Sequence, residues 1–192
     1  MCAVLALATM GWLLAPAVHT IAQTPSATVK TTGNEKSIIS TFTGRAEAFV
    51  KLRNRVRDRL PKLSKDSTAE QVAAHKNAFE AAVRSARVGA KPGDIFTSAT
   101  ADYVRRLIRT EFKGTERTEV KKAILEAETA GVPLRVNYPY PETKEFSAIP
   151  PTLLLKLPLL PKELNYRFVG RHMLLIDKEN GLILDYMVNA LP

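Results

Sequence analysis

The chain contains one cysteine and three histidines in 192 residues. The cysteine is Cys2, at the start of an N-terminal apolar segment, so a chain that loses this segment has no thiol. The remainder then forms no disulfide and offers neither a thiolate nucleophile nor a cysteine ligand to a metal. A small disulfide-stabilised scaffold is excluded. We expect no metal site and no cofactor.

The common catalytic and cofactor signatures are also missing. The sequence has no Gly-rich phosphate loop, no His-Glu-x-x-His helix and no Gly-x-Ser-x-Gly nucleophile turn. Beyond the N-terminal segment, only His75 and His172 could act as an imidazole base. His75 falls on the apolar stripe of a predicted helix, and we interpret it as a hydrogen-bonded residue at the edge of the core. Nothing here is a strong enzyme signature.

Charge is absent from the first 23 residues. An apolar run from Ala3 to Leu14 ends at Pro16, and small residues follow it, as in secretory signals. The run is shorter than the ~20 residues that a spanning helix needs. We predict a cleaved signal peptide over residues 1–23 and therefore a periplasmic or secreted protein without a transmembrane segment after cleavage. An uncleaved N-terminal anchor is the alternative.

Composition divides the rest of the chain into a leader and one domain. Residues 24–36 begin with a stretch rich in Thr, Ser, Ala and Pro that cannot build a core, and they are predicted to be a flexible leader. Residues 37–192 are long enough for a single globular domain. We predict that this domain has a helical half, residues 37–131, and a β-containing half, residues 132–192.

The helical half has apolar residues at three- and four-residue steps in four stretches, which predicts four helices joined by short turns. Ser67 and Glu70 match a capping box at the start of the second helix, and Gly89 is suited to end it. Thr97 and Thr115 are placed to cap the third and fourth. The predicted ranges are 37–60, 67–89, 97–112 and 115–130.

The β-containing half ends in a predicted hairpin. Strand formers fill 166–177 and 182–188, and Asn180-Gly181 between them is a strong hairpin signal. We also predict a short strand over 132–137 and a short helix within 150–157. Both faces of the hairpin are largely apolar, so both should be covered, one of them by the helices. The fold class is α+β. One predicted face holds Met173, Leu175, Leu184, Tyr186 and Val188; the other holds His172, Leu174, Ile176, Ile183 and Met187.

The basic residues concentrate in the helical half. Residues 44–131 contain 19 Lys and Arg against 12 Asp and Glu, whereas 132–192 contain 7 against 6. Such an excess favours anionic partners, although a solvated surface is the alternative. Arg53 and Arg57 are candidates for binding an anionic envelope polymer or a protein partner. The arginines of the first helix alternate around it and no base-reading element follows, so a nucleic-acid partner is not expected.

Two further groups carry site hypotheses. Tyr138 and Tyr140, which alternate with prolines, could form an aromatic patch for a sugar or peptide, or could hold a loop on the core. His172 and Asp185 lie on the same predicted face of the hairpin and could form a general-base pair. In the alternative, Asp177 caps the hairpin turn and Asp185 pairs with a helix arginine such as Arg105 or Arg106.

Several strings resemble a family of small exported bacterial proteins, from acidobacteria and some proteobacteria, to which no activity is assigned. The resemblance is carried by 166–171 (Tyr-Arg-Phe-Val-Gly-Arg), 174–177, 182–185, 93–97 and the proline–leucine run over 150–161. It implies export and a shared fold, but no activity and no functional residue. We therefore expect an exported, non-enzymatic protein that binds an anionic envelope component or a protein partner. The alternative is an envelope hydrolase that uses His172 with a carboxylate.

Overall fold

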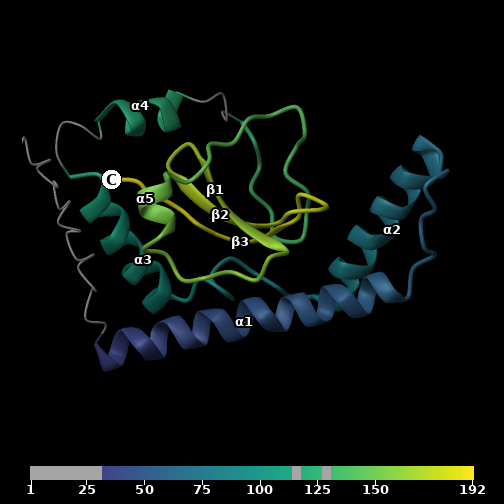
Figure 1. Cartoon of the computed structure of the whole chain (residues 1–192), viewed down its shortest axis with the longest axis horizontal. Coiled ribbons are helices and arrows are strands. Elements are labelled where there is room, and N and C mark those ends of the chain that lie inside the picture. The colour runs from purple at the N-terminus through teal and green to yellow at the C-terminus, as the bar shows by residue number, and fades with distance from the viewer. Residues whose placement is uncertain (1–31, 114–117, 127–130) are drawn as a thin grey trace, which may run out of the picture. The chain divides into compact units, whose positions relative to one another are not determined.

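The computed structural model describes residues 32–113, 118–126 and 131–192. Helices come first along the chain and a three-stranded antiparallel sheet comes last, which confirms the predicted α+β class (Figure 1). The predicted signal peptide and the leader up to residue 31 lie outside the described residues. Within the three described ranges, none of the helices combines the length and apolar character needed to cross a bilayer.

The longest helix, α1 (Gly33–Asp58), begins four residues before the prediction. Thr32 caps it, because its hydroxyl accepts from the Glu35 N–H while the Glu35 carboxylate accepts from the Thr32 N–H at 3.1 Å. The last residues assigned to the leader are therefore helical. Pro61 follows shortly after the helix end, as predicted. The buried face consists of Phe42, Ala46, Phe49, Arg53 and Val56.

The second helix, α2 (Ala69–Ala86), is capped one residue later than predicted. Thr68 and Gln71 form the capping box, and the Ser67–Glu70 prediction is wrong. Both pairs fit the same spacing, but the Ser67 hydroxyl already accepts from the Ser64 N–H at 2.9 Å, in the preceding turn. Figure 1 shows α2 beside one end of α1.

Three further helices complete the helical layer: α3 (Ser98–Glu111), α4 (Thr118–Glu126) and α5 (Pro151–Leu154). Thr97 caps α3 as predicted, accepting from the Thr100 N–H at 3.3 Å. The short helix predicted within 150–157 is confirmed as α5. Thr115, the predicted cap of α4, lies outside the described residues.

The sheet contains β1 (Leu164–Val169), β2 (His172–Asp177) and β3 (Ile183–Met187), in the order β1-β2-β3. The prediction of a single strand over 166–177 is wrong, because the chain turns within this range and forms a hairpin of β1 and β2. Gly170 turns the chain with a φ of +52°, a conformation that glycine adopts without steric cost. The predicted Asn180-Gly181 hairpin joins β2 to β3.

A β-bulge in β3 changes the predicted faces. Leu175 lies opposite Asp185 and Ile176 lies opposite Ile183, so Leu184 is the extra residue. After the bulge, each side chain of β3 points to the face opposite to the one that simple alternation predicts. Met187 therefore lies opposite Met173 on the helix-facing side, and the prediction that it shares a face with Leu174 is wrong.

Both faces of the sheet are covered, as predicted. The helices bury one face, where Phe42, Phe96 and Tyr166 stack with ring centroids 5.4–6.3 Å apart. Val132, Leu134 and Tyr140 cover the other. The strand predicted over 132–137 is wrong, because this segment crosses the sheet as a loop; an isolated bridge joins Pro139, just after it, to Leu182. A second isolated bridge joins Ser147 to Phe168.

Candidate anion-binding site

Arg53, the first of the predicted binding arginines, is buried, with 3% of its surface exposed. Its guanidinium forms ion pairs with Asp177 and Glu179, and its ζ carbon lies 5.7 Å from the centroid of the Phe79 ring. Asp177 also caps the hairpin turn, accepting from the N–H groups of Glu179 and Asn180 at 2.9 and 3.1 Å. The alternative role given to Asp177 is confirmed. Arg53 joins α1 to the sheet.

Arg57 is exposed and pairs with Asp58 at 3.3 Å, and about half of each side chain or more faces solvent. Such pairs contribute little to stability. Arg57 therefore contributes positive charge at the surface, where solvent screens its pair with Asp58. Of the two predicted arginines, only Arg57 is accessible to a partner.

Asp185 is fully buried and holds the turn between α2 and α3. Its carboxylate accepts from the N–H groups of Gly93, Ile95 and Phe96 at 2.8, 2.6 and 2.6 Å. Gly93 has a φ of +93°, so this approach uses a conformation that other residues rarely adopt. Asp185 does not pair with Arg105 or Arg106. Arg105 pairs with Asp102 at 3.2 Å, and Arg106 pairs with Glu35 at 3.8 Å.

His172 lies away from Asp185. It sits opposite Val169 at the start of β2, whereas Asp185 sits opposite Leu175. Its Nδ1 accepts from the Asn189 N–H at 3.3 Å, and among the described residues no carboxylate is bonded to the ring. Burial, with a smaller effect of Arg171, lowers the pKa of His172. The parity argument for a His172–Asp185 pair is wrong, because the bulge turns Asp185 toward the helices.

In the described ranges, no group of three or more His, Cys, Asp or Glu side chains could hold a metal ion.

Tyr140 is 4% exposed and serves the loop that covers the sheet. Its hydroxyl donates to the Glu145 carbonyl at 2.6 Å, and its ring meets Phe146 edge-on at 5.5 Å. Burial raises the pKa of the phenol. This geometry matches the alternative in which the tyrosine holds the loop on the core.

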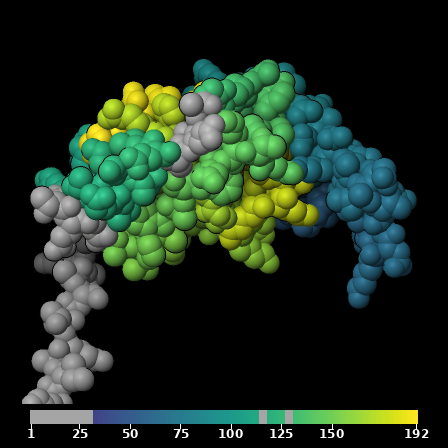
Figure 2. Space-filling model, turned by 90° about the horizontal axis from the view of Figure 1, so that it is seen from above, coloured from purple at the N-terminus to yellow at the C-terminus, as the bar shows by residue number. Residues whose placement is uncertain are grey.

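Tyr138 is 37% exposed and meets two arginines. The ζ carbon of Arg135 lies 4.0 Å from the ring centroid, and that of Arg84 lies 5.0 Å from it. Both distances are typical of cation–π contacts. We call Arg84, Arg135 and Tyr138 the arginine–tyrosine cluster. Figure 2 shows the green surface of the 131–148 loop beside the blue surface of α2, from which Arg84 comes.

A buried asparagine fixes the loop that carries Tyr138. Asn137 has a φ of +66° and is 6% exposed. Its side-chain oxygen accepts from the Arg87 guanidinium at 2.5 Å, and its N–H donates to the Ile183 carbonyl at 2.7 Å. The loop is thus attached both to the end of α2 and to β3. Tyr138 follows directly and is held beside Arg84.

The cluster carries more positive than negative charge. Arg84 pairs with Glu80 on its own helix at 3.6 Å, and Glu80 is itself buried. In the part of the chain that the structure describes, Arg135 makes no ion pair, and its contact is the Tyr138 ring. The cluster therefore has two guanidinium groups and one carboxylate, which pairs with Arg84 alone. Guanidinium groups bind carboxylates and phosphates through paired N–H donors.

The sequence predicted Tyr138 but neither arginine. Arg135 lies three residues before Tyr138, a spacing that has no special meaning in a loop. Arg84 reaches the ring from another element, 54 residues earlier in the chain. No pattern in the sequence brings α2 and this loop together.

Comparison with known proteins identifies no family. No family model matches the chain, and no curated protein matches it. One solved structure with some similarity is the C-terminal domain of inner membrane protein CigR from Salmonella enterica. It is 16% identical, covers 53% of this chain and 96% of that domain, and has a TM-score of 0.38. A likeness this distant says nothing about function.

Proposed function

We propose that the chain is an exported, non-enzymatic binding protein that holds an anionic group of an acidic envelope polymer at the arginine–tyrosine cluster. The observation that carries the proposal is the pair of guanidinium groups, 4.0 and 5.0 Å from one partly exposed tyrosine ring. A carboxylate, phosphate or sulfate ester is the chemical group that such a pair recognises best.

The tyrosine ring restricts the two arginines before any ligand arrives. A free arginine side chain loses up to about 2 kcal/mol of rotamer entropy when it is ordered. Stacking on Tyr138 removes part of that freedom in advance, so less is lost on binding. The attachment of Asn137 to Arg87 and Ile183 keeps the ring in place.

The charge of the helical half supports the same partner. This half contains 19 basic and 12 acidic residues, and its net positive charge would attract a polyanion. The attraction extends over about a Debye length, 8–10 Å at moderate salt. The exposed Arg57 contributes to this non-specific electrostatic attraction. The cluster would supply the specific contact.

The geometry favours binding over the hydrolase alternative. The hydrolase alternative requires a carboxylate that orients the His172 imidazole, as in a catalytic triad. Here Asp185 is engaged by three backbone N–H groups, and His172 accepts from a backbone N–H instead.

Retention on immobilised heparin, a sulfated and carboxylated polysaccharide, tests the proposal. Arg135→Gln should weaken heparin binding about tenfold, the loss expected for a charge-assisted contact of about 1.4 kcal/mol. Arg109→Gln is the matched control, because it removes the same charge from an exposed position on α3. Equal effects of the two variants would show that only total charge matters and would overturn the proposal.

Substitutions of Tyr138 distinguish the orienting effect of its ring from the effect of charge. Tyr138→Ala should weaken heparin binding although it removes no charge, whereas Tyr138→Phe should keep it, since the ring remains. Sodium chloride near 0.5 M, where the Debye length is only a few ångströms, should release the chain. Retention that is unaffected by salt, or equal retention on neutral dextran, would contradict an anionic ligand.

A further inference from the structure

The segment after α5 exposes large apolar side chains. Leu155 and Leu159 are 88% and 87% exposed, and Leu154 is 50% exposed. Side chains of this size are buried in most folds, and several of them exposed in one short segment mark an interaction surface. We call Leu154, Leu155 and Leu159 the leucine patch.

The leucine patch is presented by an anchored segment. Leu153, which precedes the patch, and Leu157, which lies between Leu155 and Leu159, are 0% and 4% exposed and belong to the main core. The Tyr166 hydroxyl donates to the Pro158 carbonyl at 2.9 Å, inside the protein. The Leu157 N–H donates to the Leu153 carbonyl at 3.1 Å. The exposed leucines therefore project from a fixed turn.

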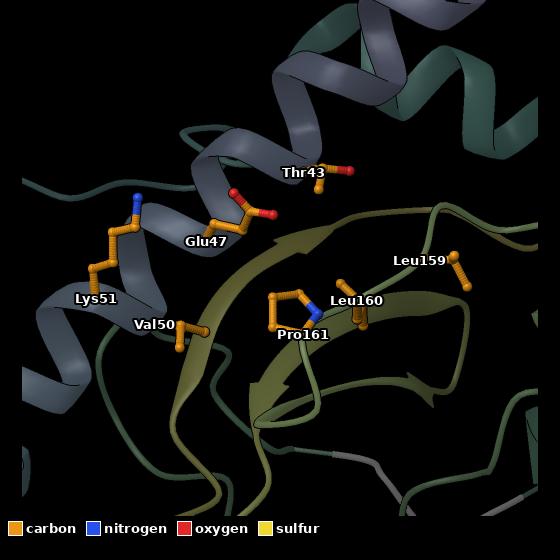
Figure 3. A pocket seen from close by; sticks show the side chains of 7 residues that line it. All are labelled: Thr43, Glu47, Val50, Lys51, Leu159, Leu160 and Pro161. Atoms are coloured by element: carbon orange, nitrogen blue, oxygen red, sulfur yellow. The ribbon is translucent and has the colours of Figure 1, made fainter.

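A shallow groove adjoins the patch. Its volume is about 380 Å³, and it is lined by Leu159, Leu160 and Pro161 on one side and by Thr43, Glu47, Val50 and Lys51 of α1 on the other. Figure 3 shows Leu159 on the side away from α1, beyond Leu160 and Pro161. Leu159 therefore borders the groove at its outer side, while 87% of its surface stays exposed to solvent.

The charges around the patch favour an anionic surface. Residues 150–162 contain Lys156 and Lys162 and no acidic residue. Lys162 is exposed, and Lys156 keeps 44% of its side chain exposed while pairing with Glu111 at 2.7 Å. Lys51 of α1 lies along the groove. The whole chain carries a formal charge of +9.

From these observations we infer that the leucine patch docks the domain on an anionic lipid bilayer surface, with the leucines in the acyl region and the lysines among the headgroups. Projecting apolar side chains flanked by lysines are what interfacial binding requires. Each lysine near a negatively charged leaflet adds to the attraction. This inference does not depend on the arginine–tyrosine cluster, which is a separate surface.

Co-sedimentation with lipid vesicles tests it. The chain should bind vesicles of phosphatidylcholine with about 30% phosphatidylglycerol, and bind pure phosphatidylcholine at least about fivefold less, as expected from one or two lysine contacts. Leu155→Ala with Leu159→Ala should lower the partition coefficient at least about tenfold, because several methylene groups no longer enter the acyl region. All proteins compared carry the same N-terminus.

Matched variants identify the responsible residues. Val88→Ala removes an apolar side chain that is 85% exposed in the turn between α2 and α3, and it should leave vesicle binding unchanged. Lys162→Gln should weaken binding to the anionic vesicles more than Lys65→Gln, a lysine exposed in the turn between α1 and α2. Both leucine substitutions lie at the surface, so circular dichroism should show the same fold.

Three outcomes would overturn the inference. The first is a double leucine variant that binds the anionic vesicles as tightly as the unmodified chain. The second is an effect of Arg135→Gln on vesicle binding that exceeds the effect of the leucine variant, which would assign lipid contact to the arginine–tyrosine cluster. The third is a dimer, seen by sedimentation velocity, that the leucine variant dissociates while vesicle binding stays the same; the patch would then join two copies of the chain.

Discussion

Asp177 and Asp185 lie on neighbouring strands of one sheet, and both are fully buried. Asp177 meets a buried arginine and two N–H groups of its own turn. Asp185 accepts from three N–H groups of a distant loop. One carboxylate is compensated mainly by an opposite charge and the other by backbone dipoles.

The two aspartates therefore show two ways in which the sheet is attached to the helices. Asp177 attaches α1 through the Arg53 side chain, while Asp185 attaches the turn between α2 and α3 through the backbone. A buried ion pair must offset the cost of removing two charges from water, so its net contribution is small even though breaking it is costly. Buried N–H groups cost free energy unless each finds an acceptor. The Asp185 carboxylate satisfies three N–H groups of the turn, and these hydrogen bonds also compensate its own charge.

The largest effect should follow from Asp185→Ala. It leaves the N–H groups of Gly93, Ile95 and Phe96 without their acceptor in a buried site, at a cost of about 3–5 kcal/mol in the free energy of unfolding. Urea denaturation measures this loss. Asp94→Ala, in the same turn, removes an acceptor of one N–H, that of Lys91, and should cost about 1 kcal/mol or less. A similar loss in both variants would contradict the special role of Asp185.

The second effect should follow from Arg53→Met, which leaves Asp177 buried without its cation. We expect a loss of about 2–4 kcal/mol in the free energy of unfolding. Combining Arg53→Met with Asp177→Asn should restore part of that loss, because no buried charge then remains unpaired. A double variant that loses the sum of the two single effects would show that the pair is not coupled.

A smaller effect should follow from Glu179→Gln. Glu179 pairs with the same guanidinium as Asp177, but 63% of its side chain is exposed. Water and salt screen that contact, so the loss should be at most about 1 kcal/mol. The measurement is the same urea titration, repeated at high salt, where the difference from the unmodified chain should shrink. A loss as large as that of Arg53→Met would contradict the importance of burial.

The smallest effect concerns His172, a partly buried titratable group of the sheet whose ring, among the described residues, is bonded to a backbone N–H and to no carboxylate. Its pKa in the folded chain is lower than the ordinary value of 6.5, chiefly because of burial. The folded state thus binds a proton less readily than the unfolded state. Stability is unaffected above about pH 6.5 and decreases as the pH falls through 6.5 toward the folded pKa.

Thermal denaturation between pH 7.5 and 5.5 tests the point. The unmodified chain should lose stability over this interval, and His172→Asn should lose less. If the two proteins show the same dependence, His172 contributes nothing to the acid sensitivity of the fold.

Features fixed by a few adjacent residues could be predicted from the sequence. The Thr97 cap, the helix end before Pro61 and the Asn180-Gly181 hairpin each depend on residues within one turn of the chain. Where two adjacent matches compete, as with Ser67 and Thr68, the choice depends on a further hydrogen bond that the pattern does not contain.

Features that depend on parity or on distant contacts could not be predicted. The turn at Gly170 lies between two apolar strings that fit one strand equally well. The bulge at Leu184 reverses the faces of the following residues, which is why Asp185 and Met187 were assigned to the wrong side. The arginine–tyrosine cluster needs α2 and a loop to meet, and nothing local to Tyr138 indicates that contact.

The segment that crosses the outer face of the sheet also reaches both of its edges. At β1, Ser147 and Phe168 exchange two backbone hydrogen bonds, at 2.8 and 2.9 Å. At β3, the Asn137 N–H donates to the Ile183 carbonyl and the Ile183 N–H donates to the Tyr138 carbonyl, at 2.7 and 2.9 Å.

These contacts occupy the backbone groups that an edge strand would otherwise present to another chain. A short three-stranded sheet with open edges is prone to strand addition and to amyloid-like stacking. Here the same loop pairs with both edges, at Phe168 near the end of β1 and at Ile183 at the start of β3. Main-chain pairing of a second chain at these two positions is therefore disfavoured.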